Sequence, residues 1–307
     1  IGTFYAFYNY LGMLIYPILD IPQLFVSGKR AFVNIDRLEE MRAFPDPVRP
    51  ASPFPVARVE RIEARGLSFS YEGREEPALD GVDFSLERGE RLAVIGPVGS
   101  GKSSLVKMMA GLLEPSSGEI LLNGRPVREA DRESLAAALG YVPQEALLFS
   151  GTIRDNVAFG APGEGRSIED EAFRAAVAEA QLSGEIASFS DGEATILGER
   201  GVTLSGGQRQ RLAIARALAR KPSLLLFDDI TASLDAANEE RLWRALDSRS
   251  RDLSCVVVSH RLSTLQYADK VLFLDRGRVA AFGRHEELLR GNAAYRAFIE
   301  EQLSMQA

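Results

Sequence analysis

A glycine-rich loop in the first half of the sequence limits the fold more than any other feature. The eight residues Gly96-Pro97-Val98-Gly99-Ser100-Gly101-Lys102-Ser103 match the pattern G-x-x-x-x-G-K-[ST]. The apolar run Arg91–Ile95 precedes the loop, and a helical pattern over Ser103–Gly111 follows it. Glycines let backbone N–H groups approach phosphate oxygens, and the start of a helix adds a partial positive charge. The sequence therefore predicts a phosphate-binding turn between a buried strand and a helix.

An aspartate at the end of a later apolar run supplies the second part of such a site. Leu224-Leu225-Leu226-Phe227 is followed directly by Asp228. In nucleotide-binding enzymes with this loop, the lysine reaches the β- and γ-phosphates. The loop serine and an aspartate at a strand end hold Mg²⁺. The pair of motifs therefore predicts binding of a nucleoside triphosphate through Lys102, with Ser103 and Asp228 near the metal.

Short apolar runs alternate with helical patterns along most of the chain. The sequence predicts strands over Val59–Phe69, Gly81–Leu86, Arg91–Ile95, Ser223–Phe227, Cys255–Ser259 and Val271–Leu274. It predicts further helices over Glu169–Gln181, Gly206–Ala219 and Ala236–Ser248. This alternation is typical of an α/β fold with a mostly parallel sheet covered on both faces.

The first residues differ from the rest of the chain. Residues 1–19 are nearly all apolar or aromatic, and Lys29 and Arg30 follow them. A membrane-spanning helix needs about 20 apolar residues, and a basic flank predicts a cytoplasmic end. A soluble hydrophobic helix is the alternative. Because residues 45–55 hold five prolines, we expect a stiff connector there. The expected division is the end of a membrane domain over 1–43, a linker over 44–57 and a nucleotide-binding domain over 58–307.

Composition narrows the possible partners. Hydrophobic residues make up 46% of the chain and charged residues 26%, which is ordinary for a folded protein. The net charge of −7 argues against a nucleic-acid partner, because phosphate contacts need a basic surface. The single cysteine, Cys255, excludes an internal disulfide.

A third motif names a family. Leu204-Ser205-Gly206-Gly207-Gln208 resembles the signature motif of ATP-binding cassette (ABC) ATPases. The resemblance covers roughly residues 58–300, with the motifs in the order of the family. It implies a P-loop NTPase cassette with a RecA-like core. An antiparallel β subdomain near residues 58–90 and a helical subdomain near 145–215, which carries the signature, would complete it.

The same resemblance implies roles for further residues. Tyr71 matches the aromatic residue that stacks on adenine, and Ser104 belongs to the phosphate loop. Gln144 matches the glutamine that senses Mg²⁺ and faces the membrane domain. His260 matches the switch histidine that contacts the γ-phosphate, and Ser233-Leu234-Asp235 matches the loop that crosses between subunits. The implied cofactors are ATP and Mg²⁺.

Two stretches resemble the exporter branch of the family. They are residues 149–157 and Gly198-Glu199-Arg200-Gly201, the second of which is similar to a segment that touches the intracellular loops of the membrane domain. The apolar N-terminal segment then reads as the last transmembrane helix of a half-transporter. This implies a plasma (inner) membrane location with a cytoplasmic cassette. The transported substrate is not predicted.

One residue departs from the pattern of the family. After the aspartate that corresponds to Asp228, called the Walker aspartate, hydrolytically active members usually carry a glutamate. Here the next residue is Asp229. A well-placed base raises a reaction rate roughly 10²–10⁴-fold. Aspartate is one methylene shorter than glutamate, so its carboxylate lies further from the reacting atoms, which predicts slow hydrolysis at this chain's own phosphate loop. The alternative is that Asp229 supports adequate hydrolysis.

The resemblance also implies composite sites. In the family each ATP lies between the phosphate loop of one subunit and the signature of the other. A homodimer of this chain would have two sites with Asp229 in place of glutamate. The combination of Asp229 with an intact signature motif therefore favours a heterodimer over a homodimer. Three functions stay open at this stage: an ATP-hydrolysing exporter subunit, a mainly nucleotide-binding regulatory half, and a soluble ABC ATPase without transport.

Overall fold

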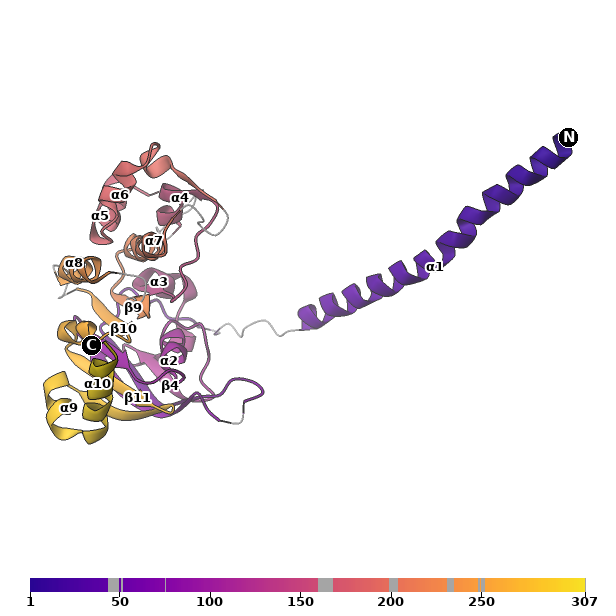
Figure 1. The fold of residues 1–307 in the computed structure, drawn as a ribbon. Helices are drawn as coiled ribbons and strands as arrows, with labels where there is room; N and C mark the ends of the chain where they lie inside the picture. The colour runs from indigo at the N-terminus through magenta and orange to yellow at the C-terminus, as the bar shows by residue number, and fades with distance from the viewer. Residues whose placement is uncertain are drawn as a thin grey trace. The chain divides into compact units, whose positions relative to one another are not determined.

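The computed structural model describes most of the chain (Figure 1). The described residues are 1–43, 50, 52–74, 76–159, 168–198, 204–230, 235–247, 249 and 252–306. The chain divides into two compact units, Ile1–Arg49 and Pro50–Ala307. Each unit is described by itself below.

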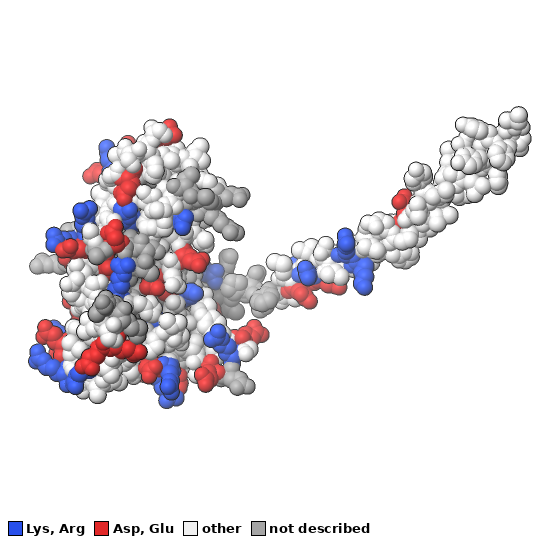
Figure 2. Space-filling view, viewed as in Figure 1, with Lys and Arg blue, Asp and Glu red and all other residues white. Residues whose placement is uncertain are grey.

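The described part of the first unit, residues 1–43, consists almost entirely of one long helix. Helix α1 runs over Gly2–Ala43 and continues through Pro17 and Pro22, and none of its residues is buried within the unit. By length and composition it can cross a membrane. Figure 2 shows a mostly uncharged surface on its N-terminal half, with Lys and Arg gathered toward the C-terminal half. This arrangement is the apolar span with a basic flank that the sequence predicts.

A six-stranded sheet forms the centre of the second unit. Its order is β12-β11-β3-β10-β9-β6, and its neighbours are parallel except for β11 and β12. The strands are β3 (Arg91–Ile95), β6 (Leu139–Val142), β9 (Leu224–Asp228), β10 (Ser254–Val258), β11 (Lys270–Asp275) and β12 (Arg278–Gly283). Strands β3, β9 and β10 are buried along their whole length, which is why their sequences are continuous apolar runs.

Alternate residues of these strands enter two separate hydrophobic clusters, one on each face. Val256 and Val258 of β10 pack with helix α2 (Lys102–Met109), whereas Cys255 and Val257 pack with helix α7 (Gly206–Leu218). The sheet is therefore covered on both faces, and the predicted α/β fold is confirmed.

A second, antiparallel sheet has the order β2-β1-β4-β5. Its strands are β1 (Arg61–Phe69), β2 (Leu79–Glu87), β4 (Ser117–Leu122) and β5 (Arg125–Pro126). The sequence predicted the first two, near residues 58–90. It missed β4 and β5, which lie beyond the phosphate loop and join this subdomain only through long-range pairing.

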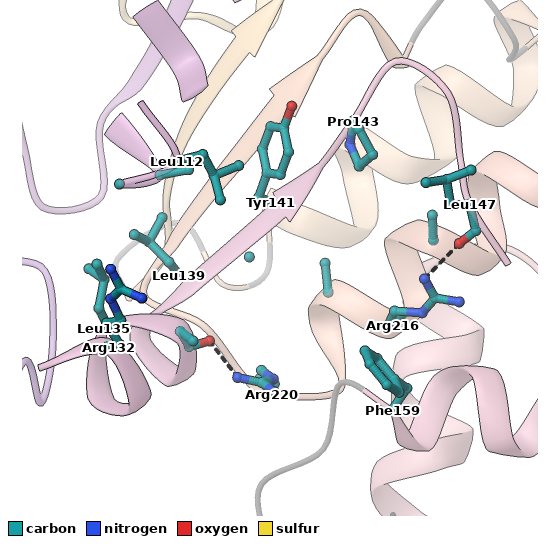
Figure 3. A pocket seen from close by; sticks show the side chains of 16 residues that line it. Leu112, Arg132, Leu135, Leu139, Tyr141, Pro143, Leu147, Phe159, Arg216 and Arg220 are labelled. Atoms are coloured by element: carbon teal, nitrogen blue, oxygen red, sulfur yellow. Dashed lines mark hydrogen bonds between the residues drawn. The ribbon is translucent and has the colours of Figure 1, made fainter. Parts of the chain in front are cut away.

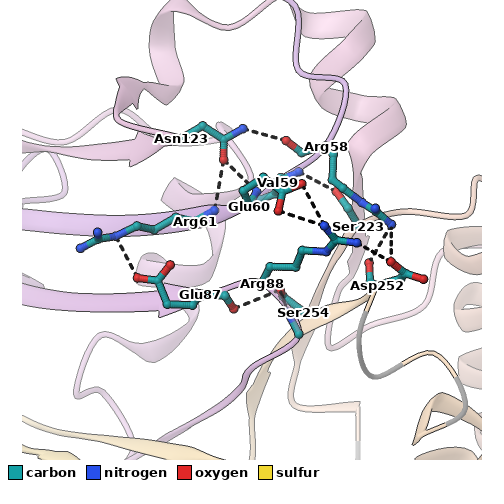
Figure 4. Close-up of polar contacts among 11 residues, drawn as sticks. Arg58, Val59, Glu60, Arg61, Glu87, Arg88, Asn123, Ser223, Asp252 and Ser254 are labelled. Atoms are coloured by element: carbon teal, nitrogen blue, oxygen red, sulfur yellow. Dashed lines mark hydrogen bonds and ion pairs between the residues drawn. The ribbon is translucent and has the colours of Figure 1, made fainter.

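Polar contacts connect this sheet to the core (Figure 4). Arg88 and Arg58 both donate to Asp252 Oδ1, at 2.6 and 3.0 Å. The Ser223 hydroxyl accepts from Val59 N–H at 2.8 Å, and the Ser254 hydroxyl accepts from Gly89 N–H at 2.9 Å. The contacts with Asp252 are exposed, so each ion pair contributes little stability.

Helices α4 (Ile153–Ala158), α5 (Asp170–Glu179) and α6 (Ser183–Ser188) lie together at one end of the unit, next to α7 (Figure 1). They form the helical subdomain predicted near residues 145–215. The other elements within the described residues are η1 (Val127–Glu129), α3 (Arg132–Ala138), β7 (Gly151–Thr152), η2 (Gly192–Ala194), β8 (Ile196–Leu197), α8 (Ala236–Asp247), η5 (Leu262–Tyr267), α9 (His285–Gly291) and α10 (Ala293–Gln306).

The second unit begins earlier than the residue 58 that the sequence suggested. Phe54 and Val56 are buried, at 6% and 3% exposure. Phe54 N–H donates to Glu129 O at 3.0 Å, and its carbonyl accepts from Asp131 N–H at 2.8 Å. The last residues of the expected linker are therefore part of the folded unit. Residues 44–49 and 51 of the expected linker lie outside the described part of the chain.

Candidate functional site

The phosphate loop joins β3 to α2 at the carboxyl end of the parallel strands, where ligands bind in open α/β sheets. Gly96 has φ 151° and Gly101 has φ 97°. A Cβ atom on Gly96 would lie 2.1 Å from the Leu274 carbonyl oxygen, and one on Gly101 would lie 2.3 Å from that of Ala78. Only glycine fits at these two positions, which explains the spacing of the motif.

Lys102 lies inside the loop and is 6% exposed. Its ammonium group donates to the carbonyl oxygens of Pro97 at 2.7 Å and of Gly96 at 2.9 Å. Burial lowers the pKa of Lys102, while Asp229 and Asp228 act in the opposite direction. The loop thus holds a buried cation between its carbonyl groups and the carboxylates at the end of β9.

The two expected metal ligands are in direct contact. Ser103 Oγ donates to Asp228 Oδ1 at 2.7 Å, and Asp228 is 3% exposed. The Tyr141 hydroxyl donates to Asp228 Oδ2 at 3.5 Å. Burial, reinforced by Asp228, raises the pKa of Tyr141 to about 12. Sequence reasoning missed Tyr141, because nothing in its local pattern shows that β6 lies beside β9.

These oxygen donors suit Mg²⁺. The described residues contain no group of three or more His, Cys, Asp or Glu side chains that could hold a metal ion. Mg²⁺ sites with phosphate ligands need no such cage, because they use one or two carboxylates together with water and phosphate oxygens. The contact between Ser103 and Asp228 therefore fits the expected cofactor.

Asp229 is buried beside this pair with a left-handed backbone, φ 53°. Its Oδ2 accepts a hydrogen bond from Gln144 Nε2 at 3.1 Å. Burial raises the pKa of Asp229, and Asp228 acts in the same direction. His260, Lys102 and Gln144 oppose the shift. The structure therefore brings together the two residues expected at the catalytic carboxylate and the Mg²⁺-sensing loop.

His260 follows β10 and completes the group. Partial burial and the nearby Lys102 charge lower the pKa of His260, and Asp229 opposes that shift. A neutral imidazole can accept a proton or donate a hydrogen bond near physiological pH.

A cavity of about 490 Å³ is lined by most of these side chains, though not by Asp228 or Tyr141. Its volume is within the usual range for small-molecule sites. Tyr71 stands at its edge, 38% exposed, and its hydroxyl lies 3.0 Å from Ser104 Oγ. Arg74 lines the cavity although no motif indicated it. The lining residues are Tyr71, Arg74, Ala78, Val98, Gly99, Gly101, Lys102, Ser103, Ser104, Gln144, Asp229, Val258 and His260.

The signature residues are placed elsewhere. Ser205 caps α7: its hydroxyl accepts from Gln208 N–H at 3.2 Å, and Gln208 Oε1 accepts from Ser205 N–H at 3.0 Å. A Cβ atom on Gly206 would meet nothing within 4 Å. Neither these residues nor Gly207 are among the described residues that line the cavity.

Asp235 also lies apart from the cavity. It is exposed and caps α8, with Oδ1 accepting from Asn238 N–H at 2.7 Å, and that hydrogen bond lowers the pKa of Asp235. Ser233, Leu234, Glu199, Arg200 and Gly201 are outside the described residues.

A second, more apolar cavity of about 640 Å³ lies between β6 and α7 (Figure 3). Leu147, which is 68% exposed, and Phe159, which is 39% exposed, line it together with Leu112 and Pro143. Arg216 Nη1 donates to the Leu147 carbonyl at 2.8 Å, and burial lowers the pKa of Arg216 to about 10. Sequence reasoning did not predict this groove, whose residues come from distant parts of the chain.

Comparison with known proteins gives consistent results. Residues 79–232 match the ABC transporter domain family. The chain is 36% identical over 310 residues to the ATP-dependent lipid A-core flippase of Burkholderia orbicola, covering 100% of this chain and 51% of that protein. It is 42% identical over 246 residues to the mycobactin import ATP-binding/permease protein IrtB of Mycobacterium tuberculosis, covering 80% of this chain and 42% of that protein.

The fold has a close counterpart among solved structures. A bacterial Atm1-family ABC exporter with ATP bound superimposes with a TM-score of 0.81 and 31% sequence identity, over 99% of this chain and 53% of that one. The predicted cassette fold is thereby confirmed. The chain spans about half or less of the length of these relatives.

Proposed function

Because this chain belongs to the ABC transporter family, whose domain binds ATP, we propose that it is the ATP-binding and ATP-hydrolysing part of an exporter. The main observation behind this proposal is the cavity of about 490 Å³, which is lined by Lys102, Ser103, Gln144, Asp229 and His260. The similarity to an ATP-bound exporter structure supports this proposal.

Each side chain has a chemical task in this proposal. Backbone N–H groups of the loop and Lys102 bind the phosphates, and Tyr71 stacks on adenine. Ser103 and Asp228 would hold Mg²⁺, with Gln144 nearby. Bound there, Mg²⁺ would neutralise charge on the phosphates. Asp229 orients or deprotonates the attacking water, and His260 contacts the γ-phosphate.

The proposed site needs a second cassette. The signature residues Ser205, Gly206 and Gly207 begin α7 and do not line the chain's own cavity. Backbone N–H groups at a helix start bind anions. We infer that they bind the ATP held by a partner subunit, and that Asp235 crosses the same interface.

Asp229 favours a heterodimer. Its carboxylate is one methylene shorter than that of glutamate and is held by Gln144 at 3.1 Å. A displacement of about 1 Å costs roughly 10²-fold in rate. The partner would then carry a glutamate after its own Walker aspartate, and this chain's signature would complete the faster site. The same observation favours a second candidate, a mainly regulatory half that binds ATP without hydrolysing it at a useful rate.

Coupling to transport would use the groove and α1. Leu147 and Phe159 expose apolar surface in the groove, next to Pro143 and hence to Gln144. We infer that cytoplasmic loops of a membrane domain dock there. Helix α1 would be the last transmembrane helix, in the plasma membrane, with the cassette in the cytoplasm. Its 42 residues argue against a soluble ABC ATPase without transport.

The test is the composition of the complex in its native membrane. The full-length chain, tagged and purified in mild detergent, should carry a second half-transporter in a 1:1 ratio. The pair should hydrolyse ATP faster than this chain alone. A homodimer with full ATPase activity would contradict the heterodimer, and a complex that neither binds nor hydrolyses ATP would contradict the proposed function.

A further inference from the structure

A buried carboxylate outside the nucleotide cavity contacts the segment that carries His260. Glu239 lies on α8 and is 3% exposed. Its Oε2 accepts from Arg261 Nη1 at 3.2 Å, and its Oε1 accepts from Thr264 Oγ1 at 3.1 Å. The Ser263 hydroxyl lies 3.4 Å from both carboxylate oxygens. A buried charge is tolerated when it is paired and hydrogen-bonded in this way.

The contacts continue to the residue before His260. The hydroxyl oxygens of Thr264 and Ser259 share a hydrogen bond of 2.9 Å, and both residues are almost fully buried. The Ser259 hydroxyl also accepts from Arg261 N–H at 3.0 Å. Both sequence neighbours of His260 are thus connected to Glu239. One is held directly through Arg261, and the other through Thr264.

Glu239 is equally close to the start of its own helix. Its N–H donates to the Asp235 carbonyl oxygen at 2.9 Å, within the first turn of α8. A continuous set of hydrogen bonds therefore runs from Asp235 through Glu239 to the turn at His260. These contacts lie between the nucleotide cavity, which His260 lines, and the exposed surface at Asp235.

We propose that Glu239 is the positioning residue for His260: through Arg261, Thr264 and Ser259 it fixes the turn from which the imidazole reaches the γ-phosphate. The inference rests on the proposed function, because it takes the γ-phosphate as the partner of His260. It adds a residue that is not among the described residues lining the nucleotide cavity and that belongs to none of the motifs.

The first test compares two glutamates on the same helix in the full-length protein. Glu239→Gln removes the buried charge, whereas Glu240→Gln removes an exposed one that pairs with Arg244. Calorimetry would measure the affinities for AMP-PNP and ADP with Mg²⁺. In Glu239→Gln, the affinity for AMP-PNP should fall about tenfold, the usual size for a weakened hydrogen bond to a charged group. The affinity for ADP, which lacks the γ-phosphate, should stay within about twofold.

A second pair of variants keeps the test independent of the stability of Glu239→Gln. Thr264→Val removes the hydroxyl at nearly constant volume and should reproduce the loss of selectivity for AMP-PNP. Thr264→Ser keeps the hydroxyl and should restore it. Equal losses of AMP-PNP and ADP affinity would show a merely structural role and overturn the proposal. An unchanged affinity ratio in both Glu239→Gln and Thr264→Val would also overturn it.

Hydrogen exchange separates this proposal from the proposed function. If the wild type binds neither nucleotide, the proposed function fails, but the mechanical link is still measurable. Amide exchange over residues 259–264 should rise at least tenfold in Glu239→Gln relative to Glu240→Gln, with residues 96–103 unchanged. Equal exchange in the two variants would contradict the link itself.

Discussion

Replacing Asp229 by glutamate should speed up ATP hydrolysis at the site built on this chain's own phosphate loop. In the structure the Asp229 carboxylate is buried, and its Oδ2 accepts from Gln144 Nε2 at 3.1 Å. It lines a cavity of about 490 Å³ that leaves room in front of it. Asp229→Glu would therefore advance the carboxylate into open space, where the attacking water must lie.

The size of the effect follows from this geometry. One additional methylene moves a carboxylate forward by about 1.5 Å, one carbon–carbon bond. A misplacement of about 1 Å costs roughly 10²-fold, and a general base contributes about 10²–10⁴-fold in total. Because the glutamate must still find its position beside Gln144, we expect a gain of about tenfold to 100-fold in kcat.

The assay is steady-state ATPase turnover of the full-length chain without a partner, in detergent or lipid. Asp229→Asn is the matched control, since it keeps the volume and removes the charge. Wild type should be slow, Asp229→Glu at least tenfold faster, and Asp229→Asn at or below wild type. A wild-type turnover of about 1 s⁻¹ or more, within the usual enzyme range, would refute the reasoning about the retracted carboxylate. Identical rates for the wild type and both variants would instead favour the second candidate function, a mainly regulatory half-transporter that binds ATP without hydrolysing it at a useful rate.

Three further predictions concern the loop, the imidazole and the groove. Gly101→Ala should lower the Tm of the nucleotide-free protein more than Gly99→Ala, because both have positive φ but only the first Cβ would clash, at 2.3 Å from a carbonyl oxygen. Burial lowers the pKa of His260 below 6.5, so neutral His260 stabilises the fold above pH 6.5, and this stabilisation is lost as the pH falls through the lowered pKa. The fall in Tm between pH 7.5 and 5 should therefore be smaller in His260→Asn than in the wild type. Leu147→Asp should uncouple transport from ATP hydrolysis measured in vesicles while ATP binding persists, whereas Leu303→Asp, also exposed, should leave both unchanged.

The sequence was most informative where a motif is local. The phosphate loop needs glycines at Gly96 and Gly101 because neighbouring backbone is too close for a Cβ atom. The strand before it and the helix after it were therefore predictable. The run ending at Asp228 is apolar because β9 is buried on both faces. The convergence of Gln144, Asp229 and His260 was predicted only through the family resemblance, since the three residues lie far apart in the chain.

What was missed depends on long-range contacts. Tyr141 reaches Asp228 because β6 pairs with β9, a pairing that no local pattern specifies. Strand β4 joins the antiparallel sheet beside β1 although helix α2 lies between them in sequence. Phe54 was assigned to a proline-rich linker, whereas its ring packs in the core and its backbone pairs with Ala130. Composition can indicate a linker, but it cannot show which linker residues pack against or pair with distant parts of the fold.

Mg-ATP binding to the full-length protein, wild type beside Lys102→Ala, is the experiment on which the proposed site depends. Lys102 is the buried cation of the loop, and its ammonium group donates to the carbonyl oxygens of Pro97 and Gly96. Calorimetry should find saturable binding of Mg-ATP to the wild type and a loss of at least 100-fold in affinity for Lys102→Ala, since two charge-assisted phosphate contacts are worth about 3 kcal/mol or more. Equal binding of Mg-ATP by both proteins, or no binding by a folded wild type, would contradict an ATP site in this cavity.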